Sequence, residues 1–396
     1  MSAQRTLLSG NEATAIAMRQ ARPDVFAAFP ITPSTEVPQY FSKFVADGQT
    51  DAVFVPVESE HSSMSACIGA SGAGARTFTA TSANGLALMW EELYIAASLR
   101  LPVVMACVNR ALSGPININN DHSDSMGARD SGWLQLYSEN AQEAYDQLFI
   151  ALKTAEAVNL PAMVCQDGFI TSHAVDAVEL VEDEAARRFC GTWQAGRSLL
   201  GSAGPVSMGP YEGPEFYMEH KRQQAEAMVS AFAAHQKAVD EYRLLTGRTL
   251  APLEAYRLDD ADYAFVLVGS SAGTGKDAID RLREKGEKVG LLKIRLFRPF
   301  PAEGFVRALA GKTTVAVMDK CDGFSGSGGP LAAELAGALY GLPEPMRPGL
   351  RPFVYGLGGR DVRVEDFFGI YESIKAPLQP NAGRVEYRGV REEAVV

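Results

Sequence analysis

The sequence predicts an α/β protein with parallel sheets in two domains, and two observations support this. Short apolar runs alternate with helical patterns along most of the chain, an order typical of parallel βαβ units. The alternation lapses between about 191 and 214 into Gly, Pro and Ser, and resumes after a helical pattern at 216–245. We therefore expect a first domain over residues 1–250, including this connecting helix, and a smaller second domain over residues 251–396.

The composition is that of a globular protein that does not bind nucleic acid. The chain has 396 residues, 46% hydrophobic and 21% charged, with a net charge of −11. Phosphate binding needs a basic face, so this charge argues against nucleic acid as a partner. No apolar run approaches the roughly 20 residues of a membrane span, and the N-terminus lacks a signal-like pattern. We expect no membrane contact and a cytoplasmic location.

The cysteines predict that this chain holds no iron–sulfur cluster. There are five, Cys67, Cys107, Cys165, Cys190 and Cys321, and no pair has the close spacing of zinc or cluster ligands. We expect free thiols that are mostly buried, so any electron carriers must lie in other chains.

The first stretch predicts a helix at 11–21 and a strand at 24–28 that enters a stiff turn at 29–35, followed by a helix to about 45. Prolines on both sides of Ile31-Thr32 restrict the backbone and shape the turn in advance. This turn could present the Thr32 hydroxyl to a ligand. The alternative is a plain connection in which Ser34 or Thr35 caps the helix.

The stretch 55–85 predicts a complete βαβ unit. A strand ends at Glu58 and Glu60, a helix of small residues follows, and a second strand leads into a Ser-Asn-Gly turn. Reactive groups gather where parallel strands end, which makes these two carboxylates candidate site residues. The alternative is that Glu60 only caps the helix or favours its dipole.

Arg110 follows the most apolar strand, which is predicted at 101–108 after a helix at 86–99. An arginine in this position is costly unless an anion meets it. A bound anionic ligand and a structural salt bridge both satisfy this requirement, and the sequence leaves both open.

Residues 113–133 predict a long ordered loop, because they show neither helical nor strand periodicity, and such loops are usually functional. Asp121, His122 and Asp124 could suggest a metal site, but one histidine is few and turn formation explains the aspartates. We predict no metal site in this chain. A helix at 141–157 and a strand at 162–165 complete a predicted sheet of five strands.

The second domain predicts strands at 263–268, 288–294 and 313–318, with a helix at 274–285 and a polar tail after 377 that wraps an edge or frays. Residues 269–276, GSSAGTGK, resemble a phosphate-binding loop. The motif needs four residues between its first Gly and the final Gly-Lys, then Ser or Thr. Here there are five, and Asp277 follows. We reject the motif, although a nucleotide-binding protein using this loop is one alternative function.

Four segments together resemble one known family. They are FPITPST at 29–35, VESEHSSMSACIGASGAGARTFTATS at 57–82, VNRALSGPININNDHSDSMGARDSGW at 108–133 and LLKIRLFRPFP at 291–301. These segments are similar to α subunits of the pyruvate:ferredoxin oxidoreductase family of thiamine-diphosphate-dependent 2-oxoacid:ferredoxin oxidoreductases, from about Leu7 to Ala376. The resemblance implies a thiamine-type pyrimidine-binding domain followed by a smaller transketolase C-terminal-like α/β domain.

The resemblance also implies the reaction and the residues that serve it. Members oxidatively decarboxylate a 2-oxoacid, most often pyruvate, with coenzyme A and ferredoxin, typically in anaerobic metabolism. It assigns Glu60 to N1′ of the cofactor's aminopyrimidine ring, and places Pro30 and Ile31 beside the cofactor. It assigns Arg110 to the substrate carboxylate, with Thr32 next to it.

The same resemblance implies that other chains complete the site. Thiamine enzymes of the family pattern hold the diphosphate and Mg²⁺ through Gly-Asp-Gly followed by a spaced asparagine. Asp47-Gly48, Asp167-Gly168 and Asp322-Gly323 all lack the first glycine. We therefore expect a β-type subunit to carry the diphosphate and Mg²⁺, γ- and δ-type subunits to complete the complex, and partner subunits to hold the [4Fe–4S] clusters that pass electrons to ferredoxin. This chain alone should be inactive.

The substrate is less firmly predicted than the mechanism. A dicarboxylate such as oxalate would need a second cationic side chain, and this position holds Thr32 instead. Thr32 therefore disfavours dicarboxylate substrates. Phe29 and Asn119 stand where the family leads us to expect Tyr and Trp, which leaves an aryl or branched 2-oxoacid, or 2-oxoglutarate, as alternatives to pyruvate. A non-redox thiamine-dependent transferase or decarboxylase component is the remaining alternative.

Overall fold

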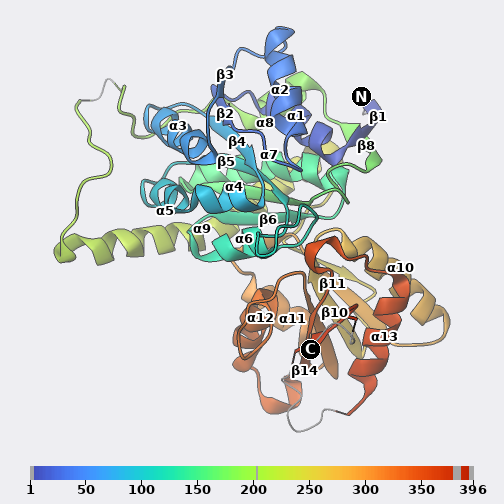
Figure 1. The fold of residues 1–396 in the computed structure, drawn as a ribbon. Coiled ribbons are helices and arrows are strands. Elements are labelled where there is room, and N and C mark those ends of the chain that lie inside the picture. Colours follow the sequence, from blue (N-terminus) through green and yellow to red (C-terminus); the bar gives the residue numbers. More distant parts are fainter. Residues whose placement is uncertain (1–3, 202–203, 378–384, 392–396) are drawn as a thin grey trace.

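The computed structural model describes residues 4–201, 204–377 and 385–391. It contains a seven-stranded sheet, a six-stranded sheet and a two-stranded ribbon. In Figure 1 the seven-stranded sheet and its helices occupy the upper part of the molecule, and the six-stranded sheet occupies the lower part.

The first sheet has the strand order β12-β6-β7-β5-β4-β2-β3. All neighbouring strands are parallel except β12, which is antiparallel to β6. The four central strands β4 to β7 are buried along their whole length, as expected where helices cover both faces of a parallel sheet. The strands are β2 (Val25–Ala28), β3 (Val53–Pro56), β4 (Thr77–Thr81), β5 (Val104–Asn109), β6 (Leu134–Ser138), β7 (Ala162–Asp167) and β12 (Leu296–Arg298).

The helices of this half pack in two layers. On one face α1 contacts α2 and α7, and on the other α3 contacts α4 and α5. Local capping explains several starts: Ser9, Ser59 and Asn140 each accept a hydrogen bond from an amide of the first turn. The helices are α1 (Gly10–Ala21), α2 (Glu36–Ala46), α3 (Glu60–Gly72), α4 (Ala83–Leu88), α5 (Trp90–Ser98), α6 (Ser123–Gly127), η1 (Ala128–Asp130), α7 (Ala141–Val158) and α8 (Asp183–Cys190).

The second sheet has the order β15-β14-β13-β10-β11-β9, with β9 antiparallel to β11. Its tail strand pairs at the edge with β14, as the sequence predicted for part of the tail, while residues 378–384 and 392–396 lie outside the described residues. The strands are β9 (Leu253–Tyr256), β10 (Tyr263–Val268), β11 (Val289–Ile294), β13 (Thr314–Asp319), β14 (Gly349–Val354) and β15 (Glu386–Tyr387). The helices are α10 (Ser271–Glu284), α11 (Ala302–Leu309), α12 (Pro330–Tyr340), η2 (Glu344–Met346), η3 (Leu357–Gly359) and α13 (Val364–Lys375).

The long helix α9 (Pro214–Thr246) joins the two halves. Near its C-terminal end Tyr242 donates to Asp146 of α7 at 2.6 Å, and Arg248, just beyond the helix, pairs with the same carboxylate at 2.8 Å. Its N-terminal end extends beyond the first sheet in Figure 1 and exposes Phe216, Tyr217 and Met218. The prediction of a connector that packs on the first domain is therefore confirmed for its C-terminal half.

Three sequence predictions about elements are wrong. The first sheet has seven strands rather than five, because β6 lies just after the predicted loop and β12 comes from a distant segment. The single helix predicted at 86–99 is two helices that meet at Met89. Neither expected cap forms on α2: the Thr35 side chain makes no capping bond, and the Ser34 hydroxyl donates to the Ile31 carbonyl at 2.8 Å.

One strand from the second half of the chain joins the first sheet and so connects the two halves. After β11 the chain crosses to the first sheet, where β12 pairs with β6. The two-stranded ribbon pairs β1 (Gln4–Ser9) with β8 (Val175–Leu180). Residues 296–298 thus belong to the first sheet although they lie in the second predicted domain.

Two expectations from composition are tested by the structure. All five cysteines are free; four are buried and Cys190 is half-buried. Among the described residues, no helix combines the length and apolar character needed to cross a membrane.

Candidate active site

The predicted site residues meet at the carboxyl edge of the first sheet. β2 leads into the turn that holds Pro30 to Pro33, β3 leads to Glu58 and Glu60, and β5 leads directly to Arg110. Because these strands are parallel, all three segments emerge on the same edge. This is the edge at which open α/β sheets bind ligands.

Glu60 is a buried carboxylate that does not cap its helix. It is the first residue of α3 and is 6% exposed. The capping bond is made by Ser59, whose hydroxyl accepts from the Ser62 amide at 3.2 Å. Within the described residues, the Glu60 side chain forms no hydrogen bond or ion pair. Glu60 therefore does not cap the helix, which contradicts one half of the alternative; the other half, a carboxylate that only favours the helix dipole, stays open.

Gly85 gives the Glu60 carboxylate its space. A Cβ at Gly85 would lie 2.7 Å from Glu60 Oε1 and 2.4 Å from Thr81 Oγ1. The hydroxyls of Thr81 and Ser82 are buried beside it without a hydrogen-bond partner in the described structure. The Ser-Asn-Gly turn was visible in the sequence, but its contact with Glu60 was not predicted.

Glu58 differs from Glu60 in exposure. Its side chain faces solvent and accepts a hydrogen bond from the Ser62 hydroxyl. That bond lowers the pKa of Glu58. Of the two carboxylates that the sequence offered, Glu60 is the one that is enclosed.

Arg110 is buried, 7% exposed, and no carboxylate of the described residues forms an ion pair with it. Its Nε donates to the Asn117 carbonyl at 3.1 Å and its Nη1 to the Thr32 carbonyl at 2.9 Å. Nη2 has no partner in the described part of the chain. The alternative of a structural salt bridge is wrong, and the structure brings Arg110 and Thr32 together as predicted.

The turn residues sit beside this arginine with different exposure. Pro30 and the Thr32 side chain are exposed, and Ile31 is half-buried. The Thr32 carbonyl accepts from Arg110 although the residue itself is exposed.

Asp124 joins the strand ends beneath the site, a role that the sequence did not reveal. Its carboxylate accepts from the amides of Ala83 at 3.0 Å and Arg110 at 2.9 Å, and from Asn109 Nδ2 at 2.8 Å. Burial raises the pKa of Asp124 to about 6, although these amide donors oppose the rise. Since Asp124 holds backbone groups at the ends of β4 and β5, it fixes the geometry of both.

Asp121 and His122, which the sequence offers with Asp124 as possible metal ligands, have separate partners. Asp121 accepts from the amides of Ser123 and Gly358, at 3.0 and 3.1 Å. His122 pairs with Asp167 at 2.8 Å. These contacts serve the loop and the junction between the sheets.

Asp167 lies at the end of β7 in a buried group of charges. Lys320 of the second half pairs with it at 2.7 Å, and the Ser270 amide donates to it at 3.1 Å. Burial alone would raise the pKa of Asp167, but Lys320 and His122 outweigh this and hold it below its usual range. The Asp167 carboxylate of the Asp167-Gly168 pair is therefore already bound by Lys320, His122 and Ser270 of this chain.

The segment that resembles a phosphate-binding loop contacts the first half of the molecule. Ser270, which precedes α10, meets Asp167, and Lys276 within α10 pairs with Glu139 at 2.8 Å. Carboxylates of the first half thus occupy the places where a phosphate would be expected. This agrees with the rejection of the motif.

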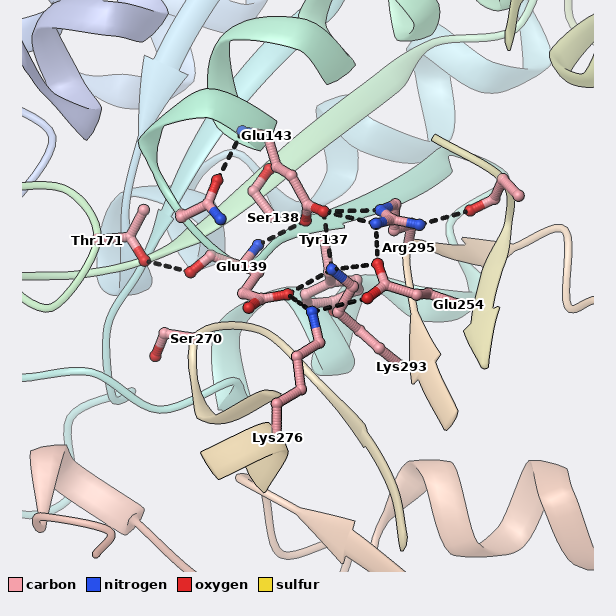
Figure 2. Close-up of polar contacts among 12 residues, drawn as sticks. Tyr137, Ser138, Glu139, Glu143, Thr171, Glu254, Ser270, Lys276, Lys293 and Arg295 are labelled. Atoms are coloured by element: carbon pink, nitrogen blue, oxygen red, sulfur yellow. Dashed lines mark hydrogen bonds and ion pairs between the residues drawn. The ribbon is translucent and has the colours of Figure 1, made fainter. Parts of the chain in front are cut away.

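Figure 2 shows a second group of charged side chains at the junction, where the two halves of the molecule meet. Lys293 Nζ lies 2.7 Å from Glu143 and 2.9 Å from Glu254, and it also contacts Glu139. Arg295 pairs with Glu143 at 2.8 Å. Burial would raise the pKa of Glu254, but Lys293 and Arg295 lower it to about 2. We call these residues with Lys276 the junction cluster; it consists of Glu139, Glu143, Glu254, Lys276, Lys293 and Arg295.

A cavity of about 680 Å³ lies elsewhere on the first sheet. Asp24, Ala52 and Arg76 line it, and they precede β2, β3 and β4. It therefore opens at the amino edge, opposite Glu60 and Arg110, and we do not assign the site to it.

A buried carboxylate and a buried arginine that forms no ion pair with any described residue lie together at the carboxyl edge of a parallel sheet, which makes this edge the candidate ligand site of an α/β protein. A family model described as "Pyruvate flavodoxin/ferredoxin oxidoreductase, thiamine diP-bdg" matches residues 16–240. A second, "Pyruvate:ferredoxin oxidoreductase core domain II", matches residues 261–367. The chain belongs to the pyruvate flavodoxin/ferredoxin oxidoreductase family.

Curated relatives match nearly the whole chain. The pyruvate synthase subunit PorA of Thermotoga maritima is 49% identical over 392 residues, covering 98% of this chain and 99% of that protein. The ketoisovalerate oxidoreductase subunit VorA of Pyrococcus furiosus is 43% identical over 383 residues, covering 96% of each. The predicted family and the identification as an oxidoreductase subunit are confirmed, so the nucleotide-binding and non-redox alternatives are wrong.

A solved structure shows the same fold. It is the 2-oxoglutarate:ferredoxin oxidoreductase from Magnetococcus marinus with 2-oxoglutarate, coenzyme A and succinyl-CoA bound, at a TM-score of 0.72 and 20% identity. The similarity covers 94% of this chain, which spans 65% of that longer chain. The predicted fold class is confirmed.

The residues around Glu60 fit the thiamine diphosphate named in the family description. The carboxylate has no partner among the described residues, Gly85 leaves a cradle beside it, and the buried Thr81 and Ser82 hydroxyls lack partners in the same part of the structure. This arrangement suits a polar heterocyclic ring, since buried polar groups otherwise require hydrogen bonds.

Proposed function

We propose that this chain is the α-type subunit of a coenzyme-A-acylating pyruvate:ferredoxin oxidoreductase. The complete enzyme would convert pyruvate and coenzyme A into acetyl-CoA and CO₂, and pass two electrons to ferredoxin. The observation that carries the proposal is the pair of buried charged groups, Glu60 and Arg110, which lie at one sheet edge and form no ion pair with any described residue. The 49% identity to a pyruvate synthase subunit supports pyruvate as substrate.

Glu60 is proposed to bind the aminopyrimidine ring of the cofactor, with Pro30 and Ile31 beside it. Thiamine diphosphate supplies the electron sink that decarboxylation of a 2-oxoacid requires. Glu60 would share a proton with ring nitrogen N1′. Its enclosure supports this role, because a hydrogen bond in a site of low dielectric is stronger than one in water.

Arg110 is proposed to bind the substrate carboxylate, with Thr32 beside it. Charge-assisted hydrogen bonds from a guanidinium to a carboxylate are about twice as strong as neutral ones. Two carbonyls orient the guanidinium and leave its Nη2 hydrogens for a ligand. The exposed Thr32 hydroxyl could supply a further donor.

The second candidate substrate is a branched 2-oxoacid. The 43% identity to a ketoisovalerate oxidoreductase subunit favours it, as do the departures at Phe29 and Asn119. Phe29 is half-buried next to the turn, and the Asn119 side chain is exposed. Aryl 2-oxoacids and 2-oxoglutarate would be tested in the same comparison.

Partner subunits are proposed to complete the site. A β-type subunit would hold the diphosphate and Mg²⁺, and β-, γ- and δ-type subunits would hold the [4Fe–4S] clusters; ferredoxin would accept electrons in the cytoplasm. Exposed apolar side chains on α4 and α5 support a covered surface next to Glu60, since large apolar patches mark interfaces. They are Leu88, Trp90, Tyr94 and Ile95.

The test is coenzyme-A-dependent reduction of a low-potential dye by the native complex. Pyruvate, 2-ketoisovalerate, 2-oxoglutarate, phenylglyoxylate and oxalate would be compared side by side. A dominant rate with pyruvate supports the proposal, and preference for a bulkier acid reassigns the substrate. Thiamine-dependent turnover by the isolated chain would refute the shared site.

A further inference from the structure

The loop that carries Arg110 is attached to the second half of the molecule. It runs from Arg110 to Asp121 and contacts a turn at Gly356–Gly359, after β14. Asn117 Nδ2 donates to the Gly358 carbonyl at 3.0 Å, and the Gly358 amide donates to Asp121 at 3.1 Å. A pair of hydrogen bonds thus joins the loop to the turn.

Asn117 links this turn to the arginine. Its carbonyl accepts from Arg110 Nε at 3.1 Å, while its Oδ1 accepts from the Asn119 amide at 2.6 Å. The same residue therefore contacts the guanidinium through its backbone and the second half through its side chain. Of the two backbone carbonyls that accept hydrogen bonds from the Arg110 guanidinium, one belongs to Asn117 of the loop and the other to Thr32.

The turn is shaped for this contact. Gly358 has φ +59° and Gly359 has φ +80°, a backbone region that favours glycine. A Cβ at Gly358 would lie 2.5 Å from Asn117 Nδ2, and one at Gly359 would lie 2.3 Å from Asn119 Cβ. Side chains at these two positions would push the loop away.

The far end of the loop is fixed to the same half. The His122 amide donates to the Lys320 carbonyl at 2.8 Å, next to the buried ion pair of Lys320 with Asp167. The loop is thus anchored beyond its end, and Asn117 restrains it near its middle.

We propose that Asn117 is a positioning residue for Arg110, through which the second half of the molecule sets the affinity for the 2-oxoacid. The inference rests on the proposed role of Arg110 in binding the substrate carboxylate. Asn117 does not touch the substrate; it holds the guanidinium so that Nη2 points to the ligand. Arginine has several rotatable bonds, and fixing it in advance lowers the cost of binding.

The test is a double-mutant cycle of Asn117→Ala and Arg110→Lys in the complete complex, with steady-state KM values for pyruvate and for coenzyme A. Asn117→Ala removes the bond to Gly358, so we expect the pyruvate KM to rise about five- to tenfold, the range for one lost hydrogen bond. The coenzyme A KM should not change. In the Arg110→Lys background the same substitution should have almost no further effect.

Two further variants separate positioning from general damage to the loop. Gly358→Ala disturbs the contact from the other side and should raise the pyruvate KM similarly. Ile118→Ala changes a half-exposed apolar side chain of the same loop and should keep the unmodified pyruvate KM. A rise with Ile118→Ala equal to that with Asn117→Ala would overturn the specific role of Asn117.

The outcomes distinguish the inference from the proposed function. Additive effects in the cycle, or an unchanged pyruvate KM in both Asn117→Ala and Gly358→Ala, overturn the inference alone. An unchanged KM in Arg110→Lys shows that Arg110 does not bind the carboxylate, so the proposed role and the inference fall together.

Discussion

The carboxyl edge of the first sheet and the junction between the two sheets both bury charged side chains, but they treat them differently. At the junction, Lys293 meets three carboxylates, and Asp167 meets Lys320 and His122. At the edge, Glu60 and Arg110 are also buried, yet neither forms an ion pair with any described residue.

The difference separates structural charges from charges kept for a ligand. A buried charge without a partner is unfavourable by several kcal/mol, so a fold retains one only where something else meets it. At the junction the partners are internal and hold the sheets together. At the edge we propose that cofactor and substrate are the partners.

The largest expected effect is at Glu60. Glu60→Gln keeps the shape but removes the ionisable group, so we expect kcat of the complex to fall about 10²- to 10⁴-fold, the range for a lost acid–base group. Subunit assembly, measured by gel filtration, should be unchanged.

Glu58→Gln is the matched control, because Glu58 is exposed on the same strand end and should tolerate the change. Normal turnover by Glu60→Gln with loss in Glu58→Gln would move the role to Glu58.

At the junction we expect stability to change instead of catalysis. Lys293→Met leaves the three carboxylates with Lys276 and Arg295, and losing one member of a buried ion pair costs about 3–5 kcal/mol. Thermal unfolding should reveal this, while kcat per folded complex stays the same. Arg222→Met, at an exposed pair with Glu226 on α9, is a control that should leave stability nearly unchanged. Equal stability of the two variants would contradict the structural role of the cluster.

Asp319 tests whether cations, rather than burial, keep a carboxylate charged. It is as buried as Asp167, but its hydrogen bonds come from the Leu331 and Ala332 amides at 2.8 and 3.1 Å. Burial raises the pKa of Asp319 to about 7. Above about pH 4 the unfolded chain has released this proton while the folded chain retains it, so stability falls as pH rises toward 7.

The measurement is urea unfolding from pH 5 to pH 7. Relative to Asp319→Asn, which cannot titrate, the unmodified protein should lose about 2 kcal/mol of unfolding free energy over this range. The difference in unfolding free energy between the unmodified protein and Asp167→Asn should receive no such contribution from Asp167 over this range, because the lowered pKa keeps that carboxylate charged throughout. A pH-independent difference between the unmodified protein and Asp319→Asn would contradict the raised pKa.

The smallest expected effect is at Arg110. Arg110→Lys retains the charge but loses the planar donor geometry, so the pyruvate KM should rise about tenfold, with the coenzyme A KM unchanged. Thermal unfolding should change little, because no internal ion pair is lost. A large loss of stability with an unchanged KM would make Arg110 a structural residue.

Most helices and strands of the first half were predictable, because their signals are local. The periodicity of 11–21 and 141–157 and the apolar run at 101–108 mark α1, α7 and β5 without reference to the rest of the chain. β12 was missed because three residues become a strand only through pairing with β6. The break between α4 and α5 at Met89 was likewise not predicted, because no Gly or Pro stands at that position.

The candidate site was predictable as a set of residues but not as a set of contacts. Motif resemblance pointed to Glu60, Thr32 and Arg110, and the strand order placed them at one edge. Asp124 and Gly85 were missed in their actual roles, since a buried acceptor of four donors and a glycine that makes room for a carboxylate have no sequence signature. Their roles as site residues remain predictions for the variants above.

By itself, the sequence determined the family, the α/β class and the residues that can carry the chemistry, because these depend on local patterns and motifs. Only the tertiary structure decided which charges are paired. Glu139 with Lys293 and Asn117 with Gly358 lie more than a hundred positions apart, and each contact exists only once the two sheets dock. Docking pairs the charges of the junction and leaves Glu60 and Arg110 without an ion-pair partner among the described residues.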